Sequence, residues 1–144
     1  MVLDLVMSLM AGDLRSGSEK GRPRLLLVED DAGVRRSLQL LLQAKGFDVR
    51  AYATGAALLA DASADGARLF VADYSMDDLD GIEVLSRLRA RGWTGPAVLI
   101  TAYPSPALDA RARAKGFDIV LEKPFRDHVL VDTVTKLADQ ERRV

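Results

Sequence analysis

Short apolar segments alternate with helical segments from Arg24 onward, and this alternation limits the fold more than any other feature of the chain. Five apolar runs bounded by turn residues have the character of strands, at residues 24–29, 47–52, 68–73, 97–101 and 117–122. Helical segments follow them in turn, at residues 32–45, 55–63, 81–91, 105–115 and 126–140. Repeated strand–helix units fold into a parallel sheet with right-handed crossovers.

The strand sequences indicate that helices cover both faces of this sheet. The runs LLLV and AVLI are continuously apolar, which is typical of parallel strands buried between two helical layers. We therefore predict an α/β, flavodoxin-like (βα)5 fold with a five-stranded parallel sheet in the order 2-1-3-4-5. The predicted buried helical stripes, with Gly46 as a C-cap, are Val34, Leu38, Leu41 and Leu42 in the first helix and Val129, Leu130, Val134 and Leu137 in the last.

The domain organisation predicted for the 144 residues is one domain at 24–141, preceded by an apolar segment and polar linker at 1–23. Residues 1–11 are too short to span a bilayer and lack the basic region of a signal peptide. They could be a frayed tail, or a short helix that docks on the domain or pairs in a homodimer. The chain ends at Val144, directly after the last predicted helix, so no output domain is expected.

Charge and composition exclude several kinds of partner and site. The net charge of −1 gives no reason to expect nucleic-acid binding, and no membrane association is predicted. The chain has no cysteine, so it can form neither a disulfide nor a thiolate metal site. We expect a cytoplasmic location.

Polar residues end four of the predicted strands: Glu29 and Asp30, Asp73, Thr101, and Lys123. Open α/β sheets bind ligands beyond the carboxyl ends of their strands, and strands 1 and 3 are neighbours in the order 2-1-3. Their carboxylates should converge, which is unfavourable unless a cation neutralises them. Oxygen ligands with open positions suit Mg²⁺. With a hydroxyl and a lysine close by, the pattern indicates phosphoryl transfer, in which a carboxylate can be the nucleophile.

Each of these residues also has an ordinary structural explanation. Asp30 or Asp31 could cap the helix that follows, and Thr101 could be there for its strand preference. Lys123 could be a solvated side chain. Only the joint pattern at four strand ends favours a reaction site.

The motifs LLLVEDD, ADYSMDDLDG, LITA and LEKPF together resemble the receiver domain of two-component response regulators over residues 24–141. The resemblance implies that Asp73 is the phospho-acceptor and that Mg²⁺ is the cofactor. It implies a metal site made by Glu29, Asp30, Asp73 and the backbone carbonyl of Ser75.

The same resemblance implies roles for the remaining strand ends. Thr101 and Lys123 would bind the phosphoryl group, and the Lys123–Pro124 peptide bond would be cis. Gly81 matches the glycine that closes the loop after the acceptor. Ser75 and Tyr103 occupy the two positions that tune access to the aspartyl phosphate and its lifetime.

The sequence departs from the family pattern in two places. Asp77 stands where the family usually has proline, and Val120 stands at the position of the switch aromatic. Tyr103 could take over part of that aromatic's role. The carboxylates of Asp77, Asp78 and Asp80 are interpreted as solvated turn residues, or alternatively as groups that tune Mg²⁺ affinity or kinase docking.

The function predicted is that of a stand-alone phospho-accepting module, which is not an enzyme but assists its own phosphotransfer and dephosphorylation. A sensor histidine kinase or histidine phosphotransfer protein would supply the phosphoryl group. A downstream protein would read it on the face formed by segments 105–115, 117–122 and 126–140.

Two other functions remain open. The first is a phosphate-independent pseudo-receiver that acts as a docking or dimerisation module. The second, an aspartate-dependent phosphatase, is disfavoured because Ser75 stands where the general acid would be. Trp93 is interpreted as a packing anchor and His128 as a solvated residue.

Overall fold

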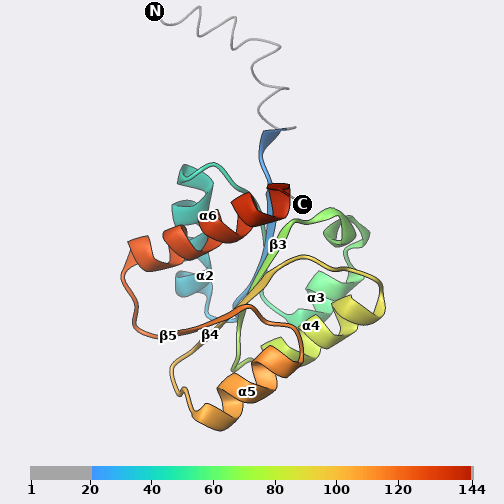
Figure 1. Cartoon of the computed structure of the whole chain (residues 1–144), viewed down its shortest axis with the longest axis vertical. Helices are drawn as coiled ribbons and strands as arrows, with labels where there is room; N and C mark the ends of the chain where they lie inside the picture. The colour runs from blue at the N-terminus through green and yellow to red at the C-terminus, as the bar shows by residue number, and fades with distance from the viewer. Residues whose placement is uncertain (1–20, 144) are drawn as a thin grey trace, which may run out of the picture.

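The computed structural model describes residues 21–143, with side chains to residue 140, and its five strands form one parallel sheet. The sheet order is β2-β1-β3-β4-β5, which confirms the predicted topology (Figure 1). The strands are β1 (Arg24–Val28), β2 (Asp48–Tyr52), β3 (Leu69–Asp73), β4 (Ala97–Thr101) and β5 (Ile119–Glu122).

Helices cover both faces of the sheet, as the continuously apolar strands predicted. The helices α2 (Ala32–Ala44) and α6 (Asp127–Arg143) pack on one face. On the other face lie α3 (Gly55–Ala60), α4 (Gly81–Ala90) and α5 (Pro106–Ala114) (Figure 1). A 3₁₀ turn, η2 (Ala62–Gly66), connects α3 to β3.

The core lies in two layers because successive strand residues point to opposite faces of the sheet. In β3, Phe70 and Ala72 pack under α3, α4 and α5, whereas Leu69 and Val71 pack under α2 and α6. All five residues of this strand are buried, including Asp73 at its carboxyl end. The carboxylate of Asp73 therefore lies at the edge of the core, where the central strand ends.

Three details of the predicted helices differ from the structure. Val34 is 37% exposed, so the buried stripe of α2 consists of Leu38 and Leu42, with Leu41 half-buried. The helix predicted at 55–63 ends at Ala60, because the Asp61 side chain accepts the N–H of Ser63 and starts the 3₁₀ turn. The last helix continues to Arg143, beyond its predicted end at residue 140.

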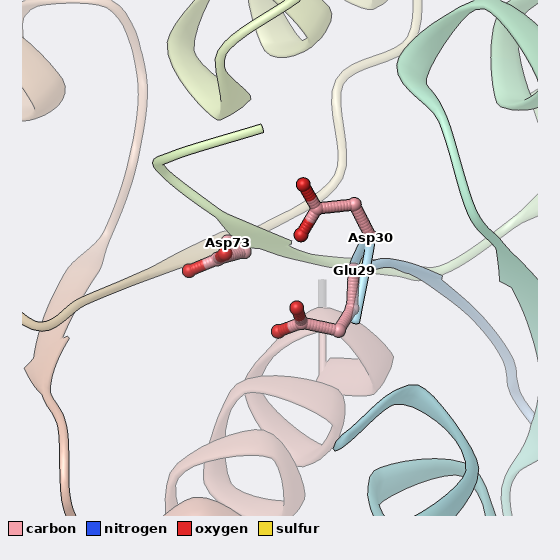
Figure 2. Close-up of side chains that lie close together, drawn as sticks. All are labelled: Glu29, Asp30 and Asp73. Atoms are coloured by element: carbon pink, nitrogen blue, oxygen red, sulfur yellow. The ribbon is translucent and has the colours of Figure 1, made fainter. Parts of the chain in front are cut away.

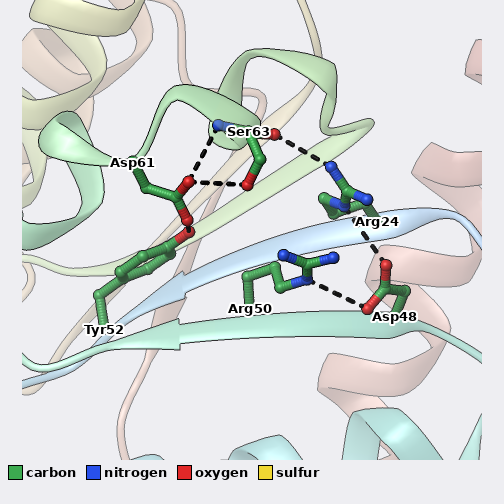
Figure 3. Close-up of polar contacts among 6 residues, drawn as sticks. All are labelled: Arg24, Asp48, Arg50, Tyr52, Asp61 and Ser63. Atoms are coloured by element: carbon green, nitrogen blue, oxygen red, sulfur yellow. Dashed lines mark hydrogen bonds and ion pairs between the residues drawn. The ribbon is translucent and has the colours of Figure 1, made fainter.

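Polar side chains link β1 and the edge strand β2 to the 3₁₀ turn (Figure 3). Arg24 forms an ion pair of 3.3 Å with Asp48, its register partner on β2, and donates to the carbonyl oxygen of Ser63 at 3.0 Å. The Tyr52 hydroxyl donates to Asp61 at 2.6 Å. This bond is the main cause that lowers the pKa of Asp61 to about 2, whereas burial and Asp61 raise the pKa of Tyr52.

Trp93 is a packing anchor at the opposite end of the sheet from Asp73, as predicted. It is buried in the connection from α4 to β4, and its ring meets Phe70 edge-on at 6.4 Å. Its indole N–H donates to the carbonyl oxygen of Ala67 at 2.8 Å.

His128 is exposed, as predicted. Within residues 21–143, no helix combines the length and apolarity needed to cross a membrane.

Candidate functional site

The carboxyl ends of β1 and β3 bring three carboxylates together. The two strands pair in parallel with Val28 opposite Ala72, so Glu29 and Asp73 follow side by side. One carboxylate oxygen from each of Glu29, Asp30 and Asp73 lies within 4.8 Å of the other two. In Figure 2 the three side chains come from the two adjacent strand ends, with their carboxylates turned to the same side.

Two of the three carboxylates are withdrawn from water. Asp73 is 7% exposed and Glu29 is 2% exposed, whereas Asp30 is only half-buried. Burial raises the pKa of both Asp73 and Glu29, and a neighbouring carboxylate raises each further: Asp30 for Asp73, and Asp73 for Glu29. The site is therefore electrostatically costly in the absence of a cation.

Lys123 supplies one positive charge to this cluster. Its Nζ lies 3.1 Å from Asp73 Oδ1 and 3.5 Å from Glu29 Oε1. Burial lowers the pKa of Lys123, but the hydrogen bond and charge of Asp73, with help from Glu29, outweigh burial and leave the pKa raised. The ammonium thus stays charged beside the acceptor carboxylate. The Lys123–Pro124 bond is cis, as predicted.

The carboxylates of the turn after β1 make different contacts. Asp31 caps α2 by accepting the N–H of Val34 at 2.9 Å, so the cap is Asp31 and not Asp30. Glu29 Oε2 accepts the N–H of Asp31 at 3.1 Å. Asp30 remains available at the carboxylate cluster.

Arg35 also belongs to this site, although no motif in the sequence points to it. Its Nη1 donates to the backbone carbonyl oxygens of Glu29 at 2.9 Å and Asp30 at 3.4 Å. Arg35 lies one helical turn after the Asp31 cap, and only the folded turn reveals this contact. Arg35 holds the backbone from which two of the three carboxylates project.

The neighbouring strand end carries Thr101, which is 3% exposed. Asp73 pairs with Ile100 in the β3–β4 register, so Thr101 lies one residue further along. Its Oγ1 accepts the N–H of Tyr103 at 3.1 Å, and among the described residues its hydroxyl donates no hydrogen bond. Tyr103 itself is 83% exposed. Val120, at the predicted switch position, is half-buried against the core under α5.

Gly81 begins α4 directly behind the acceptor. A Cβ at this position would lie 2.7 Å from the backbone oxygen of Asp73 and 2.9 Å from Leu99 Cδ1. The loop between them is closed at its base, where the N–H of Gly81 donates to the carbonyl oxygen of Tyr74 at 3.2 Å. The predicted loop-closing glycine therefore has a steric cause, the close approach of two backbone segments.

The acidic loop after Asp73 has more structure than solvated turn residues would have. Asp78 accepts the N–H groups of Gly55 at 3.2 Å and Ala56 at 3.0 Å at the start of α3. Asp80 caps α4 by accepting the N–H of Glu83 at 2.8 Å. Asp78 is thus exposed, as interpreted, but its carboxylate also pairs with α3, whereas Asp80 is half-buried and acts as a helix cap. Asp77 is exposed, as is Ser75, the predicted metal ligand through its carbonyl.

The sequence of this chain also matches those of known proteins. Residues 25–135 match the response regulator receiver domain family. The chain is 29% identical over 122 residues to DctD of Rhizobium meliloti, a C4-dicarboxylate transport transcriptional regulatory protein, covering 85% of this chain and 26% of that protein. It is 34% identical over 103 residues to the transcriptional regulatory protein FixJ of Bradyrhizobium diazoefficiens, covering 72% of this chain and 50% of that protein.

Solved structures show the same fold. A CheY-like receiver domain protein from Methanospirillum hungatei has a TM-score of 0.79 at 23% identity, over 85% of this chain and 98% of that one. The response regulator TrrA from Thermotoga maritima, solved in complex with Mg²⁺ and BeF, has a TM-score of 0.70 at 27% identity, over 80% and 98%.

The match of residues 25–135 extends across all five strands and the first half of α6, and it contains every strand-end residue described above. The chain spans about half the length, or less, of curated relatives such as FixJ and DctD. This protein belongs to the response regulator receiver domain family.

Proposed function

We propose that the domain accepts a phosphoryl group on Asp73 from a phosphohistidine in a Mg²⁺-dependent reaction, and that the phosphoryl group changes its binding to a downstream protein. The observation that carries this proposal is the surroundings of Asp73. It is a buried carboxylate at a strand end, grouped with two further acids and held 3.1 Å from a lysine.

The residues present fit a magnesium ion. Oxygen ligands of Mg²⁺ lie at about 2.0–2.1 Å from the ion in octahedral geometry, so they are separated from each other by roughly 3–4 Å. Oxygens of Glu29, Asp30 and Asp73 lie within 4.8 Å of one another, which side-chain rotation can close. We infer that these carboxylates, with the carbonyl of Ser75, hold the ion. When bound, Mg²⁺ neutralises charge on the carboxylates and on the transferring phosphoryl oxygens.

The proposed reaction is a displacement at phosphorus. A carboxylate oxygen of Asp73 forms the new bond to phosphorus while the bond from phosphorus to the imidazole nitrogen of the donor breaks. The electron pair of that bond stays on the imidazole, and the product is an aspartyl phosphate. Lys123, already 3.1 Å from Asp73, would then pair with a phosphoryl oxygen, and the hydroxyl of Thr101 would donate to another.

The partners follow from this chemistry. A sensor histidine kinase or a histidine phosphotransfer protein would present the phosphohistidine, and the solved structure of TrrA with Mg²⁺ and BeF is a precedent for ligand binding in this family. The downstream protein would bind the face formed by α5, β5 and α6. The domain ends the reaction with the phosphoryl group attached to itself, so it is a phospho-acceptor and not a turnover enzyme.

The structural change that follows phosphorylation would differ from the one usual in the family, in which an aromatic side chain swings inward as the threonine moves. Val120 offers no ring that could swing inward when Thr101 moves, and Tyr103, hydrogen-bonded to Thr101 through its backbone, would take part of that role. Exchange of Tyr103 for alanine should then change the dephosphorylation rate or partner binding. A variant with both properties unchanged would remove Tyr103 from the mechanism.

The function is tested by intact-mass spectrometry after incubation with acetyl phosphate, with and without Mg²⁺. We expect one phosphoryl adduct in the wild type with Mg²⁺ and none in Asp73→Asn. Asp77→Asn, which removes an exposed carboxylate four residues away, should keep the adduct.

Absence of the adduct from the wild type under all conditions would contradict the proposal. It would favour the alternative function, a phosphate-independent docking module. The observation in favour of that alternative is Val120 in place of the aromatic switch residue.

A further inference from the structure

The helix α3 has its first four N–H groups paired, although it is only six residues long. Helix starts leave these donors without partners inside the helix. Thr54 pairs two of them: its Oγ1 accepts from Ala57 at 3.0 Å and its carbonyl oxygen accepts from Leu58 at 3.3 Å. Asp78, more than 20 residues further along the chain, accepts the other two, from Gly55 and Ala56.

Asp78 belongs to the loop that carries Ser75. Among the described residues, its bonds to α3 are the only hydrogen bonds recorded from residues 75–79 to another element. The two ends of the loop are held separately. The N–H of Tyr74 donates to the carbonyl oxygen of Ile100 at 2.8 Å, and Asp80 caps α4. The middle of the loop is therefore anchored by hydrogen bonds only through Asp78.

The loop and the start of α3 are also in close contact. A Cβ on Gly55 would lie 2.6 Å from Val84 Cγ2 and 3.3 Å from the Leu79 side chain. Gly55 is buried, so water cannot readily replace the carboxylate as the partner of its N–H. Asp78 and Ala56 are exposed, so the bond to the buried Gly55 is the part of the anchor that water replaces least readily.

The Asp78 carboxylate is charged in this setting. Hydrogen bonds from the backbone N–H groups of Ala56, Leu79 and Gly55 outweigh the effect of burial and lower its pKa. A negative charge at a helix start is further favoured by the helix dipole. The turn lacks the proline usual in the family, which would stiffen it, and carries Asp77 there instead.

We propose that Asp78 is a positioning residue for the metal site. By anchoring residues 75–79 to α3, it holds the backbone carbonyl of Ser75 where Mg²⁺ requires it, and this role rests on the proposed function. Asp78 acts through the loop and touches neither the ion nor the phosphoryl group.

A simpler explanation, attraction between Mg²⁺ and any nearby carboxylate, predicts that Asp77 matters as much as Asp78. Asp77 is its neighbour in the sequence and is exposed like Asp78, but it has no hydrogen bond or ion pair within the described part of the chain. Exchange of either residue for alanine removes the same charge from the same loop. Only exchange of Asp78 removes the anchor.

The test compares the full chain with Asp78→Ala, Asp78→Asn and the control Asp77→Ala. Hydrogen exchange of the Gly55 and Ala56 amides reports the anchor. Calorimetric titration with MgCl₂ gives the affinity, and phosphorylation by acetyl phosphate at varied MgCl₂ gives the half-saturating concentration and the maximal rate. All measurements are made well below the melting temperature, so that a loss of stability does not enter.

We expect Asp78→Ala to lose the amide protection and to weaken Mg²⁺ binding about tenfold, as the loss of a supporting partner of a metal ligand does. The maximal rate should stay within about twofold, because the carboxylates and Lys123 remain. Asp78→Asn, which keeps one acceptor oxygen, should give a smaller loss. Asp77→Ala should keep the protection and change the affinity less than about twofold, since an exposed charge is well screened.

Equal losses of Mg²⁺ affinity in Asp77→Ala and Asp78→Ala would overturn the proposal in favour of charge alone. Unchanged affinity in Asp78→Ala despite lost amide protection would overturn it as well. A wild type that binds Mg²⁺ but takes no phosphoryl group would contradict the proposed function only, because the calorimetric comparison still decides the role of Asp78.

Discussion

Gly81 is the residue at which the acceptor strand and the following helix come closest. A Cβ there would lie 2.7 Å from the backbone oxygen of Asp73, and backbone atoms in a buried strand have little freedom to move away. We expect Gly81→Ala to lower the free energy of unfolding by about 1–3 kcal/mol, the usual range for overpacking. Urea denaturation followed by circular dichroism measures this.

The control for Gly81 is another helical glycine. A Cβ on Gly33, which lies exposed in the first turn of α2, would have its nearest contact at 3.4 Å, with Asp31 Oδ1. Gly33→Ala should leave stability unchanged or raise it by up to about 1 kcal/mol, because alanine favours the helix. If both variants had the same stability, the steric explanation for Gly81 would be wrong.

Carboxylates in this chain have different roles that residue type alone cannot separate. Asp30, Asp31, Asp78 and Asp80 all follow or occupy turns, yet Asp31, Asp78 and Asp80 accept backbone N–H groups of three different helices. Asp31 and Asp80 cap the helix that follows directly, which is a local pattern visible in the sequence. Asp78 pairs with residues 22 and 23 positions earlier, so its role depends on tertiary structure.

Element by element, the strands were the most predictable part of the fold. Continuously apolar runs such as LLLV and AVLI indicate buried parallel strands, and 2-1-3-4-5 is the common sheet order for five strand–helix units. This order also brought Glu29, Asp30, Asp73 and Lys123 together as predicted, because the carboxyl ends of neighbouring strands meet at one edge. Helix ends were less predictable, since the stop at Ala60 depends on one side-chain bond from Asp61.

The helix α5 is linked to the acceptor loop by Arg111. Its guanidinium lies 5.8 Å from the ring centroid of Tyr74, donates to the Tyr74 hydroxyl at 3.4 Å and faces Asp80 at 3.8 Å. Exposed contacts of this kind are well screened by solvent, so Arg111→Ala should change stability little. We expect it instead to speed hydrogen exchange at Glu83, whose N–H is capped by Asp80.

A second arginine on α5 provides the control for Arg111. Arg113 pairs with Asp109 at 3.0 Å on its own helix and donates to the carbonyl oxygen of Asp118 at 3.0 Å, away from the acceptor loop. Arg113→Ala should leave exchange at Glu83 unchanged. Equal exchange in both variants would show that α5 and the loop are not connected through Arg111.

The connection from α4 to β4 depends on Trp93. Trp93→Phe keeps an aromatic ring beside Phe70 but leaves the carbonyl oxygen of Ala67 without its donor. Ala67 is only half-buried, so we expect a loss of about 1 kcal/mol in the free energy of unfolding, the usual net contribution of one hydrogen bond. The measurement is urea denaturation followed by circular dichroism. Tyr103→Phe is the control: Tyr103 is 83% exposed, so this variant should change the free energy of unfolding by less than about 0.5 kcal/mol.

The acidic site opposes folding of the domain unless a bound cation neutralises its carboxylates. Glu29 and Asp73 have pKa values raised above their ordinary 4.5 and 3.8, chiefly by burial. A raised carboxyl pKa means that the folded protein binds protons more tightly than the unfolded chain. The contribution of these groups to stability therefore falls as the pH rises from the ordinary values through the raised ones.

Mg²⁺ should offset this loss of stability, because it binds the deprotonated carboxylates of the folded protein. At a hundredfold excess over its dissociation constant, a ligand of the folded state adds about 2.7 kcal/mol to the free energy of unfolding. We expect MgCl₂ to raise the melting temperature near neutral pH, and the increase to shrink as the pH falls through the raised pKa values toward 4.5 and 3.8. Asp73→Asn should show a smaller increase, and Asp77→Asn the wild-type one. An increase that is independent of pH, or equal in Asp73→Asn, would mean that the ion binds elsewhere.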